Sequence, residues 1–294
     1  MNNDSICSAI CPLFNFGIID YPEAETSKEE AEKYVKAQIE RIKQGFQISE
    51  RVSLRWTTEE ELQQISSWPF DSIFKDSNVL IHERTFVLEI HPLENDDVKK
   101  IAHEVLLALR LHKEGNVFTK IIWFENKNGC FEPSFCLESR LSEPPSREIY
   151  FIKVREIEEI ELLLDRIVKR SLDTVKGLRI ACERFNRSYE ERRADDKIID
   201  FAIAFEALFF EGEKSPGGTG QIVGMGCSML LGNSEKERIE TREFLKTAYD
   251  FRNAIVHGSE FDSPIKVVGK SYKLDDFVSQ LREYLRKSIK KLIQ

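Results

Sequence analysis

IIDFAIAFEALFF, residues 198–210, is the stretch that decides the fold of the second half of the chain. It is apolar along almost its whole length, which is too long for an ordinary strand and typical of a buried helix. Asp195 and Asp196 come just before it, and acidic residues favour the first turn of a helix because of the helix dipole. The stretch therefore predicts a helix at the centre of a bundle.

Helical periodicity continues on both sides of this stretch, and strand-like patterns stop near residue 155. Gly258 directly follows His257, which is typical of a helix C-cap. The helices expected around the central one are 157–170, 172–189, 221–231, 234–257 and 274–293. Residues 151–294 are therefore expected to form an all-α bundle.

Residues 1–150 instead mix helix and strand patterns. Ser27 with Glu30, and Thr58 with Glu61, have the spacing of capping boxes and predict two helix starts. A third helix is expected over 96–113, capped by Asn95 and ended by Gly115. Strands are predicted over 79–82, 85–91, 117–124 and 148–154. We expect a small α/β unit with a sheet of about four strands, and an α+β protein overall.

Composition restricts the class of protein. Of the 294 residues, 41% are apolar and 32% charged, so the chain can fill a core and does not resemble a disordered protein. No signal peptide is visible, and the apolar centre of the uncharged run, 222–231, is too short to cross a bilayer. We expect a soluble, cytoplasmic protein with no membrane partner.

The six cysteines contain no CxxC pair and have no histidines at zinc-site spacing. Reduced thiols and no metal site are expected.

The charge divides unequally between the two halves. Residues 1–150 hold 17 Lys and Arg against 26 Asp and Glu, a net charge of −9, whereas residues 151–294 hold 26 against 25, a net charge of +1. This split indicates two units with different roles and does not by itself identify a polyanionic partner. The Gly-rich segment 212–220 fits neither phosphate-loop motif and has no strand before it, so we expect a loop between helices.

The candidate site is YDFRNAIVHG, residues 249–258. Asn253 and His257 are four residues apart and share a helix face, with Arg252 one step round. One explanation is structural, because Arg and His near a helix C-terminus complement the helix dipole. The other is proton transfer by His257, the only histidine in residues 151–294. A full acid–base pair would then need a second chain or a partner of another type.

These residues resemble the R-x(4–6)-H signature of HEPN domains. The segment ERFNRSYE at 183–190, followed by the 198–210 helix with Glu206-Ala-Leu near its centre, is similar to the ApeA-like HEPN subgroup. The resemblance covers roughly residues 172–293. It implies a helical bundle that pairs with a second copy, and an endoribonuclease that needs no metal or other cofactor.

The resemblance also implies the roles of individual residues. Arg252 and His257 are the equivalents of the catalytic pair, with Asn253 at the polar position after the arginine. The family is common in bacterial toxin–antitoxin and antiphage systems, so RNA is the expected substrate and an antitoxin or defence protein a possible partner. The uncharged segment 221–231 departs from relatives that carry an arginine there. A non-catalytic module that binds RNA or nucleotide, or mediates assembly, is therefore the alternative.

Two further residues are candidates for supporting roles. Glu206 lies among Phe and Ala, so it is expected either to reach solvent or to pair with a basic group such as Arg252. Tyr249 is three residues before Arg252 on the same face, where packing is the simpler explanation. Trp56, Trp68 and Trp123 could stack on bases, but core packing is favoured.

Overall fold

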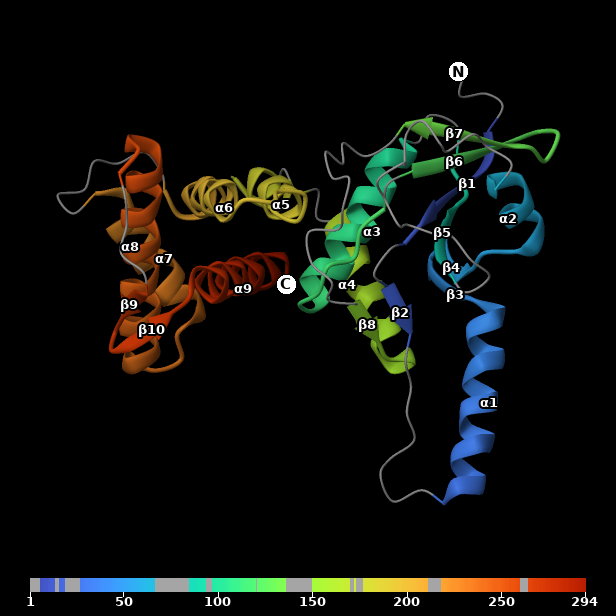
Figure 1. Cartoon of the computed structure of the whole chain (residues 1–294), viewed down its shortest axis with the longest axis horizontal. Coiled ribbons are helices and arrows are strands. Elements are labelled where there is room, and N and C mark those ends of the chain that lie inside the picture. Colours follow the sequence, from blue (N-terminus) through green and yellow to red (C-terminus); the bar gives the residue numbers. More distant parts are fainter. Residues whose placement is uncertain are drawn as a thin grey trace. The chain divides into compact units, whose positions relative to one another are not determined.

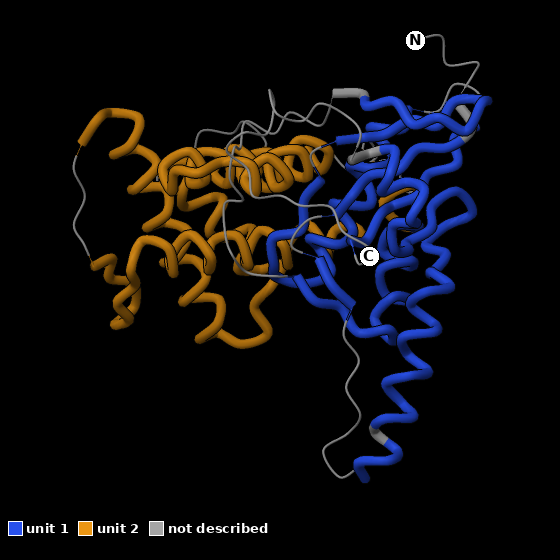
Figure 2. Tube along the Cα trace, turned by 45° about the vertical axis from the view of Figure 1, so that its right-hand side comes forward, with its two compact units in different colours: residues 1–165 blue, residues 166–294 orange. Residues whose placement is uncertain are grey.

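The computed structural model describes most of the chain, and the described residues are 6–13, 16–18, 27–66, 85–93, 97–119, 121–135, 150–169, 172, 177–210, 218–259 and 264–294. The chain forms two compact units, residues 1–165 and 166–294, drawn in blue and orange in Figure 2. The first unit carries the main sheet and the second is mostly helical. The α+β fold predicted from the sequence is confirmed.

The boundary between the units lies beyond the position expected from the sequence, at residues 165 and 166 instead of 150. The reason is a long-range strand pair. β8 (Tyr150–Ile152) pairs in parallel with β2 (Phe16–Ile18), so the chain just after residue 150 still belongs to the first unit. The division falls inside α4 (Ile157–Lys169).

The first unit is built on a six-stranded antiparallel sheet in the order β3-β4-β5-β1-β6-β7 (Figure 1). Its strands are β1 (Ile6–Pro12), β3 (Phe46–Ser49), β4 (Val52–Trp56), β5 (Phe86–Ile90), β6 (Ile121–Asn126) and β7 (Phe131–Phe135). β1 lies between β5 and β6, and Ala9, Ile10 and Cys11 on it have no exposed surface. Trp123 on β6 is also fully buried in this core, so the predicted packing role is confirmed for this tryptophan.

The sequence predicted part of this sheet. The strands expected at 85–91 and 117–124 correspond to β5 and β6 of this sheet, and the strand expected at 148–154 corresponds to β8, which pairs with β2 in a separate two-stranded sheet. The strand expected at 79–82, like Trp68, lies outside the described residues. The remaining strands were missed because most of them are short, and alternation over three to five residues is too brief to be a clear signal.

The helices of the first unit are α1 (Lys28–Gln44), α2 (Glu59–Ser66), α3 (Val98–His112), the short 3-10 helix η3 (Val154–Glu156) and α4. Both predicted capping boxes are present, since Glu30 accepts from the Ser27 amide and Glu61 from the Thr58 amide. Asp97, not the expected Asn95, caps α3, and Asn95 lies outside the described residues.

The second unit contains α5 (Leu178–Arg187), α6 (Ala194–Phe209), α7 (Thr219–Leu231), α8 (Glu235–His257) and α9 (Leu274–Ile293). α6 is the predicted apolar helix, and it packs against the four other helices. The core is largely aromatic: the Phe244 and Phe277 rings stack with centroids 4.5 Å apart. Asp200, buried on α6, accepts a hydrogen bond from Arg184 of α5 at 2.9 Å, which ties the two helices together.

This unit also holds an unpredicted hairpin, β9 (Ile265–Val267) and β10 (Lys270–Tyr272). Its turn places Val268 at a φ of 45° and Gly269 at 76°. A β-branched residue seldom adopts a positive φ, so the sequence gives no ordinary turn signal here. Among the helices that the structure describes, none is both long and apolar enough to cross a membrane.

Candidate active site

The candidate residues lie near the C-terminal end of α8. Gly258 has the left-handed conformation, with a φ of 69°, and its amide bonds back to the last carbonyls of α8. The Ser259 amide also bonds to Ala254 at 2.8 Å. The predicted glycine cap is thus confirmed, and it ends the helix directly after His257.

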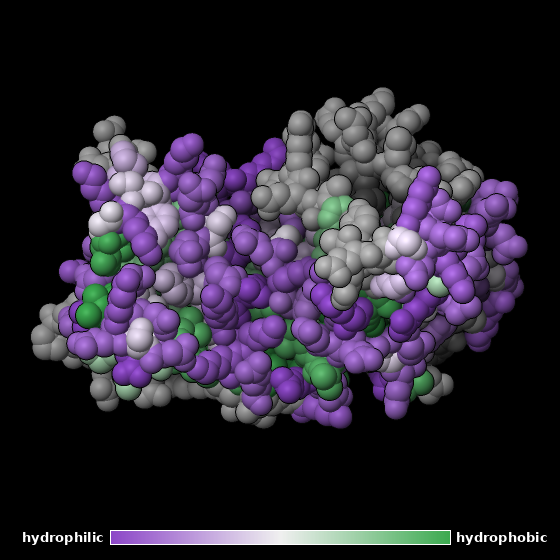
Figure 3. All heavy atoms as spheres, turned by 90° about the horizontal axis from the view of Figure 1, so that it is seen from below, coloured by the Kyte–Doolittle hydropathy of each residue, from purple (hydrophilic) through white to green (hydrophobic). Residues whose placement is uncertain are grey.

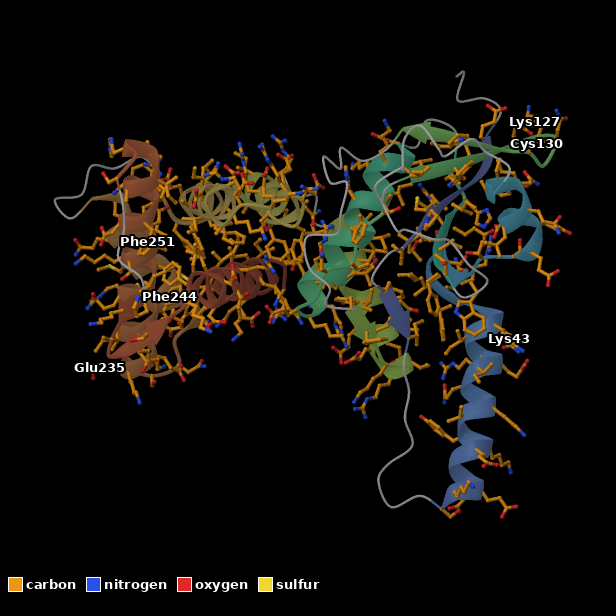
Figure 4. All side chains as sticks on the ribbon, viewed as in Figure 1. Lys43, Lys127, Cys130, Glu235, Phe244 and Phe251 are labelled. Atoms are coloured by element: carbon orange, nitrogen blue, oxygen red, sulfur yellow. The ribbon has the colours of Figure 1, made fainter. Side chains whose placement is uncertain are left out.

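α8 has two chemically different faces. Phe244 and Phe251, labelled in Figure 4, pack on Phe277 of α9 and belong to the core. The opposite face carries Lys246, Asp250, Asn253 and His257 at intervals of three or four residues, and all four are exposed. Tyr249 and Arg252 lie on the flank between these faces.

A cavity of about 310 Å³ opens beside this polar face, entirely within the second unit. α8 contributes Lys246, Tyr249, Asp250, Arg252 and Asn253, and α6 contributes Glu206. The remaining wall is the N-terminal turn of α7 with its cap, residues 218–221. Four of the five predicted residues, Glu206, Tyr249, Arg252 and Asn253, are therefore brought together.

Tyr249 joins three elements at the wall of the cavity. Its buried hydroxyl donates a hydrogen bond to the Ala202 carbonyl of α6 at 3.0 Å. On its other side, a Cβ atom at Gly220 would be only 2.8 Å from Tyr249 Cβ, so this contact with α7 requires glycine. Burial, together with the nearby Glu206 carboxylate, raises the pKa of the phenol well above its usual range, partly opposed by Arg252. Tyr249 is therefore a neutral hydroxyl, and the predicted packing role is consistent with its position.

Arg252 is half-buried, and its Nη1 donates to Asn253 Oδ1 at 3.2 Å. Within the described part of the chain, Arg252 makes no ion pair with a carboxylate, Glu206 included. Glu206 is partly exposed at the cavity wall, which agrees with the first of its two expected environments, contact with solvent. The Arg252 guanidinium therefore keeps most of its donors available for an anion.

His257 occupies a different position. It is exposed and is not part of the cavity wall. It lies one helical turn beyond Asn253 on the same face, a rise of about 6 Å along the axis. The spacing that placed Asn253 and His257 on one face is confirmed, but one copy of the chain does not bring His257 into the cavity with Arg252.

Several residues of the wall were not predicted. Asp250 and Lys246 could have been found by extending the spacing of Asn253 and His257 by one and two turns, respectively, toward the N-terminus. Residues 218–220 were assigned to a loop, but α7 begins at Thr219, so its first turn faces the cavity. Amide groups in the first turn of a helix have no intrahelical acceptor and carry a partial positive charge.

Among the residues that the structure describes, no group of three His, Cys, Asp or Glu side chains is arranged to hold a metal ion. Comparison of the chain with protein-family models, with curated proteins and with solved structures finds no match.

Proposed function

We propose that the protein is a cytoplasmic, metal-independent endoribonuclease of the HEPN type, in which Arg252, Asn253 and His257 carry out catalysis. The observation that carries this proposal is the half-buried Arg252 at a cavity wall, without a carboxylate partner among the described residues. Such an arginine has no evident structural task, and its planar set of donors fits a phosphodiester.

Each residue has a role in the proposed cleavage. The 2′-hydroxyl of RNA attacks the adjacent phosphorus, which requires removal of one proton and donation of another to the leaving 5′-oxygen. His257 transfers a proton, because histidine is the side chain used most often for general acid–base catalysis. Arg252 stabilises the charge on the pentacovalent phosphorus, and Asn253 holds the guanidinium through the 3.2 Å contact.

Two other parts of the cavity wall offer donors for a phosphate. Lys246 lies on the wall contributed by α8, and the first-turn amides of α7 lie on the facing wall. A phosphate between them would receive donors from both sides. Tyr249 and Glu206 keep their supporting roles, Tyr249 as the packed hydroxyl that joins α6 and α7 to α8.

The position of His257 supports a homodimer. His257 lies outside the cavity of its own chain, so a second copy is the simplest source of the histidine that completes the site. α7 offers a surface for this contact, since it carries no charged residue and exposes Met225 by 48% and Met229 by 71%. On the face of the molecule drawn in Figure 3, small hydrophobic patches are scattered over a mostly hydrophilic surface. An antitoxin or defence protein is a further expected partner.

The test is cleavage of single-stranded RNA by the full chain. Activity should survive EDTA and leave 2′,3′-cyclic phosphate ends, and DNA, which lacks the 2′-hydroxyl, should not be cut. His257→Ala should lower the rate by about 10²–10⁴-fold. Arg242 lies on the same helix but outside the cavity wall, so the control variant Arg242→Lys should leave the cleavage rate unchanged. Activity that requires a divalent metal, or that is unchanged in His257→Ala, would exclude this mechanism.

The alternative is a non-catalytic module that binds RNA or nucleotide, or mediates assembly. The exposed position of His257 and the uncharged α7 favour it. It predicts RNA binding that weakens in Arg252→Ala, is unchanged in His257→Ala, and is never followed by cleavage.

A further inference from the structure

A second cavity, of about 600 Å³, lies in the first unit. It is formed by the C-terminal half of α1, the start of β3, η3 and the first turns of α4. Its volume is within the range of about 300–1,000 Å³ found for small-molecule pockets. None of its lining residues belongs to the proposed RNA site, which lies in the second unit.

One wall follows from the way α1 ends. Tyr34, Gln38 and Arg41 recur at intervals of four and three, so one face of α1 lines the cavity. Gly45, with a φ of 77°, ends α1, and the chain continues directly into β3; the two elements follow one another in Figure 1. The turn brings the Arg41 guanidinium to 5.8 Å from the centre of the Phe46 ring.

The other wall is held by Glu156. Its carboxylate accepts hydrogen bonds from the Lys153 amide at 2.7 Å and from Lys113 Nζ at 2.6 Å. These bonds fix η3 to the end of α3. Arg155, Glu158 and Glu161 are presented to the cavity from this anchored segment.

Three apolar side chains belong to the lining of the cavity. Phe46, Val154 and Ile157 line it and have exposed fractions of only 7%, 4% and 5%. An aromatic ring beside aliphatic side chains suits a flat, weakly polar group.

The rim of the cavity suits an anion. Arg41 and Arg155 are both exposed there, and neither makes an ion pair with any described carboxylate. Elsewhere in this unit, Arg55 is saturated by two carboxylates, so unpaired arginines are not the general rule. Two guanidinium groups on opposite walls can bind one phosphate between them.

The cavity also holds acceptors that lack a donor. Gln38 Oε1 is buried and has no hydrogen-bond partner in the described part of the chain, which costs stability unless a ligand supplies an N–H group. Burial and the neighbouring Glu158 raise the pKa of Glu161, whose carboxyl would also gain from a donor. The missing partner is therefore a group such as an amine.

We propose that this cavity binds a free nucleoside monophosphate whose base carries an exocyclic amino group. The base lies against the apolar residues Phe46, Val154 and Ile157 and donates its amino hydrogens to Gln38 and Glu161, while the phosphate is bound by Arg41 and Arg155. A single ligand of this kind would contact the apolar side chains, the hydrogen-bond acceptors and the two arginines of the cavity at the same time. The first unit would then be a nucleotide-binding unit, whatever the second unit does to RNA.

The test is titration calorimetry of the full chain with AMP and CMP, compared with UMP, adenosine and inorganic phosphate. AMP and CMP should bind with one site per chain. UMP lacks the amino group, and adenosine and inorganic phosphate each lack one half of the ligand, so each should bind at least about tenfold more weakly.

Variants locate the site. Arg155→Ala should weaken AMP binding by at least about tenfold, because a charge-assisted hydrogen bond is lost. Gln38→Met should abolish the preference for AMP over UMP. Arg166→Ala, an exposed arginine of α4 outside the lining, is the matched control. Arg155 is itself exposed, so its loss should leave the far-UV circular dichroism unchanged.

Three results would overturn the proposal: no saturable binding of AMP or CMP at millimolar concentration, phosphate binding as tightly as AMP, or AMP binding unaffected by Arg155→Ala. Binding of single-stranded RNA that depends on Arg155, without AMP binding, would also overturn it. Full AMP affinity in Arg252→Ala is expected, so failure here and failure of the ribonuclease proposal are distinguishable.

Discussion

Arg55 in the first unit and Arg252 in the second lie in opposite electrostatic environments. Arg55 donates two hydrogen bonds to Glu61, at 2.6 and 3.0 Å, and two to Glu89, at 2.9 and 3.0 Å. Among the described residues, Arg252 donates only to the side-chain amide oxygen of its neighbour Asn253, and it lies beside a cavity. Both side chains carry the same charge, so the charge alone does not indicate their roles. The difference is that the N–H donors of Arg55 are already bonded to carboxylates within the protein, whereas most donors of Arg252 are not.

The comparison assigns different consequences to the loss of each side chain. Removing Arg55 leaves two carboxylates without their partner in a largely buried place, so the cost falls on folding. Removing Arg252 leaves no unpaired described carboxylate within ion-pair distance, so the cost falls on ligand binding and catalysis.

Among the changes that test this comparison, the largest effect is expected for Arg252→Ala. If Arg252 stabilises the developing charge on phosphorus, RNA cleavage should fall by about 10²–10³-fold, the usual cost of losing one such donor. The free energy of unfolding should change by no more than about 0.5 kcal/mol. Cleavage rates and urea unfolding of the same preparation measure both. A loss of stability as large as the loss of activity would make Arg252 a structural residue like Arg55.

The converse result is expected for Arg55→Ala, which should lower the free energy of unfolding by about 3 kcal/mol because Glu61 and Glu89 lose their common partner. Tryptophan fluorescence during urea unfolding reports on the correct unit, since all three tryptophans lie in residues 1–165. Lys43→Ala is the control, because Lys43 pairs with Glu40 at the surface of the same unit, where such a pair contributes little. Equal stabilities for the two variants would contradict the comparison.

A third prediction extends the comparison from charges to apolar surfaces. Met229→Glu places a charge on the exposed face of α7, and if copies pair there the dimer should dissociate at least about tenfold more readily. Leu162→Glu is the matched control in the first unit, where Leu162 is 59% exposed on α4. Analytical ultracentrifugation should find the unmodified protein and Leu162→Glu at twice the mass of one chain. A monomeric unmodified protein would disprove the homodimer.

The two units also differ in how well their sequences predicted them. In the second unit the apolar run 198–210 and the glycine after His257 are local signals, so α6 and the end of α8 were predicted correctly. In the first unit β1 was missed, because its burial depends on β5 and β6, which lie far along the chain. The boundary between the units lies further along the chain than predicted for a similar reason, because β8 pairs with the distant strand β2.

The site was predictable to a similar extent. Helical spacing correctly placed Tyr249, Arg252 and Asn253 beside one another. It could not show that His257 stays outside the cavity, because spacing gives the face of a helix but not what lies opposite it. The α7 wall was missed because its glycines, typical of a loop, are here required by contact with Tyr249 at Gly220.

The smallest expected effect is the pH dependence that Glu89 gives to the free energy of unfolding. Hydrogen bonds from Arg55 lower the pKa of the Glu89 carboxyl, although burial alone would raise it. A carboxyl whose pKa is lower in the folded state contributes stability that is fully present above its unfolded pKa, about 4.3, and is lost as the pH falls through the folded pKa. One such group changes the free energy of unfolding by at most about 1.4 kcal/mol per pH unit.

Glu89→Gln isolates this contribution, because it keeps the shape of the side chain and removes the titrating charge. The variant should be less stable than the unmodified protein at neutral pH, and the difference should shrink as the pH falls below about 4. Urea unfolding followed by tryptophan fluorescence at several pH values measures it, with the exposed Glu40→Gln of α1 as control. A stability difference that stays constant from neutral to acidic pH would show that Glu89 contributes by shape alone, and that Arg55 is held by Glu61 without help from its second carboxylate.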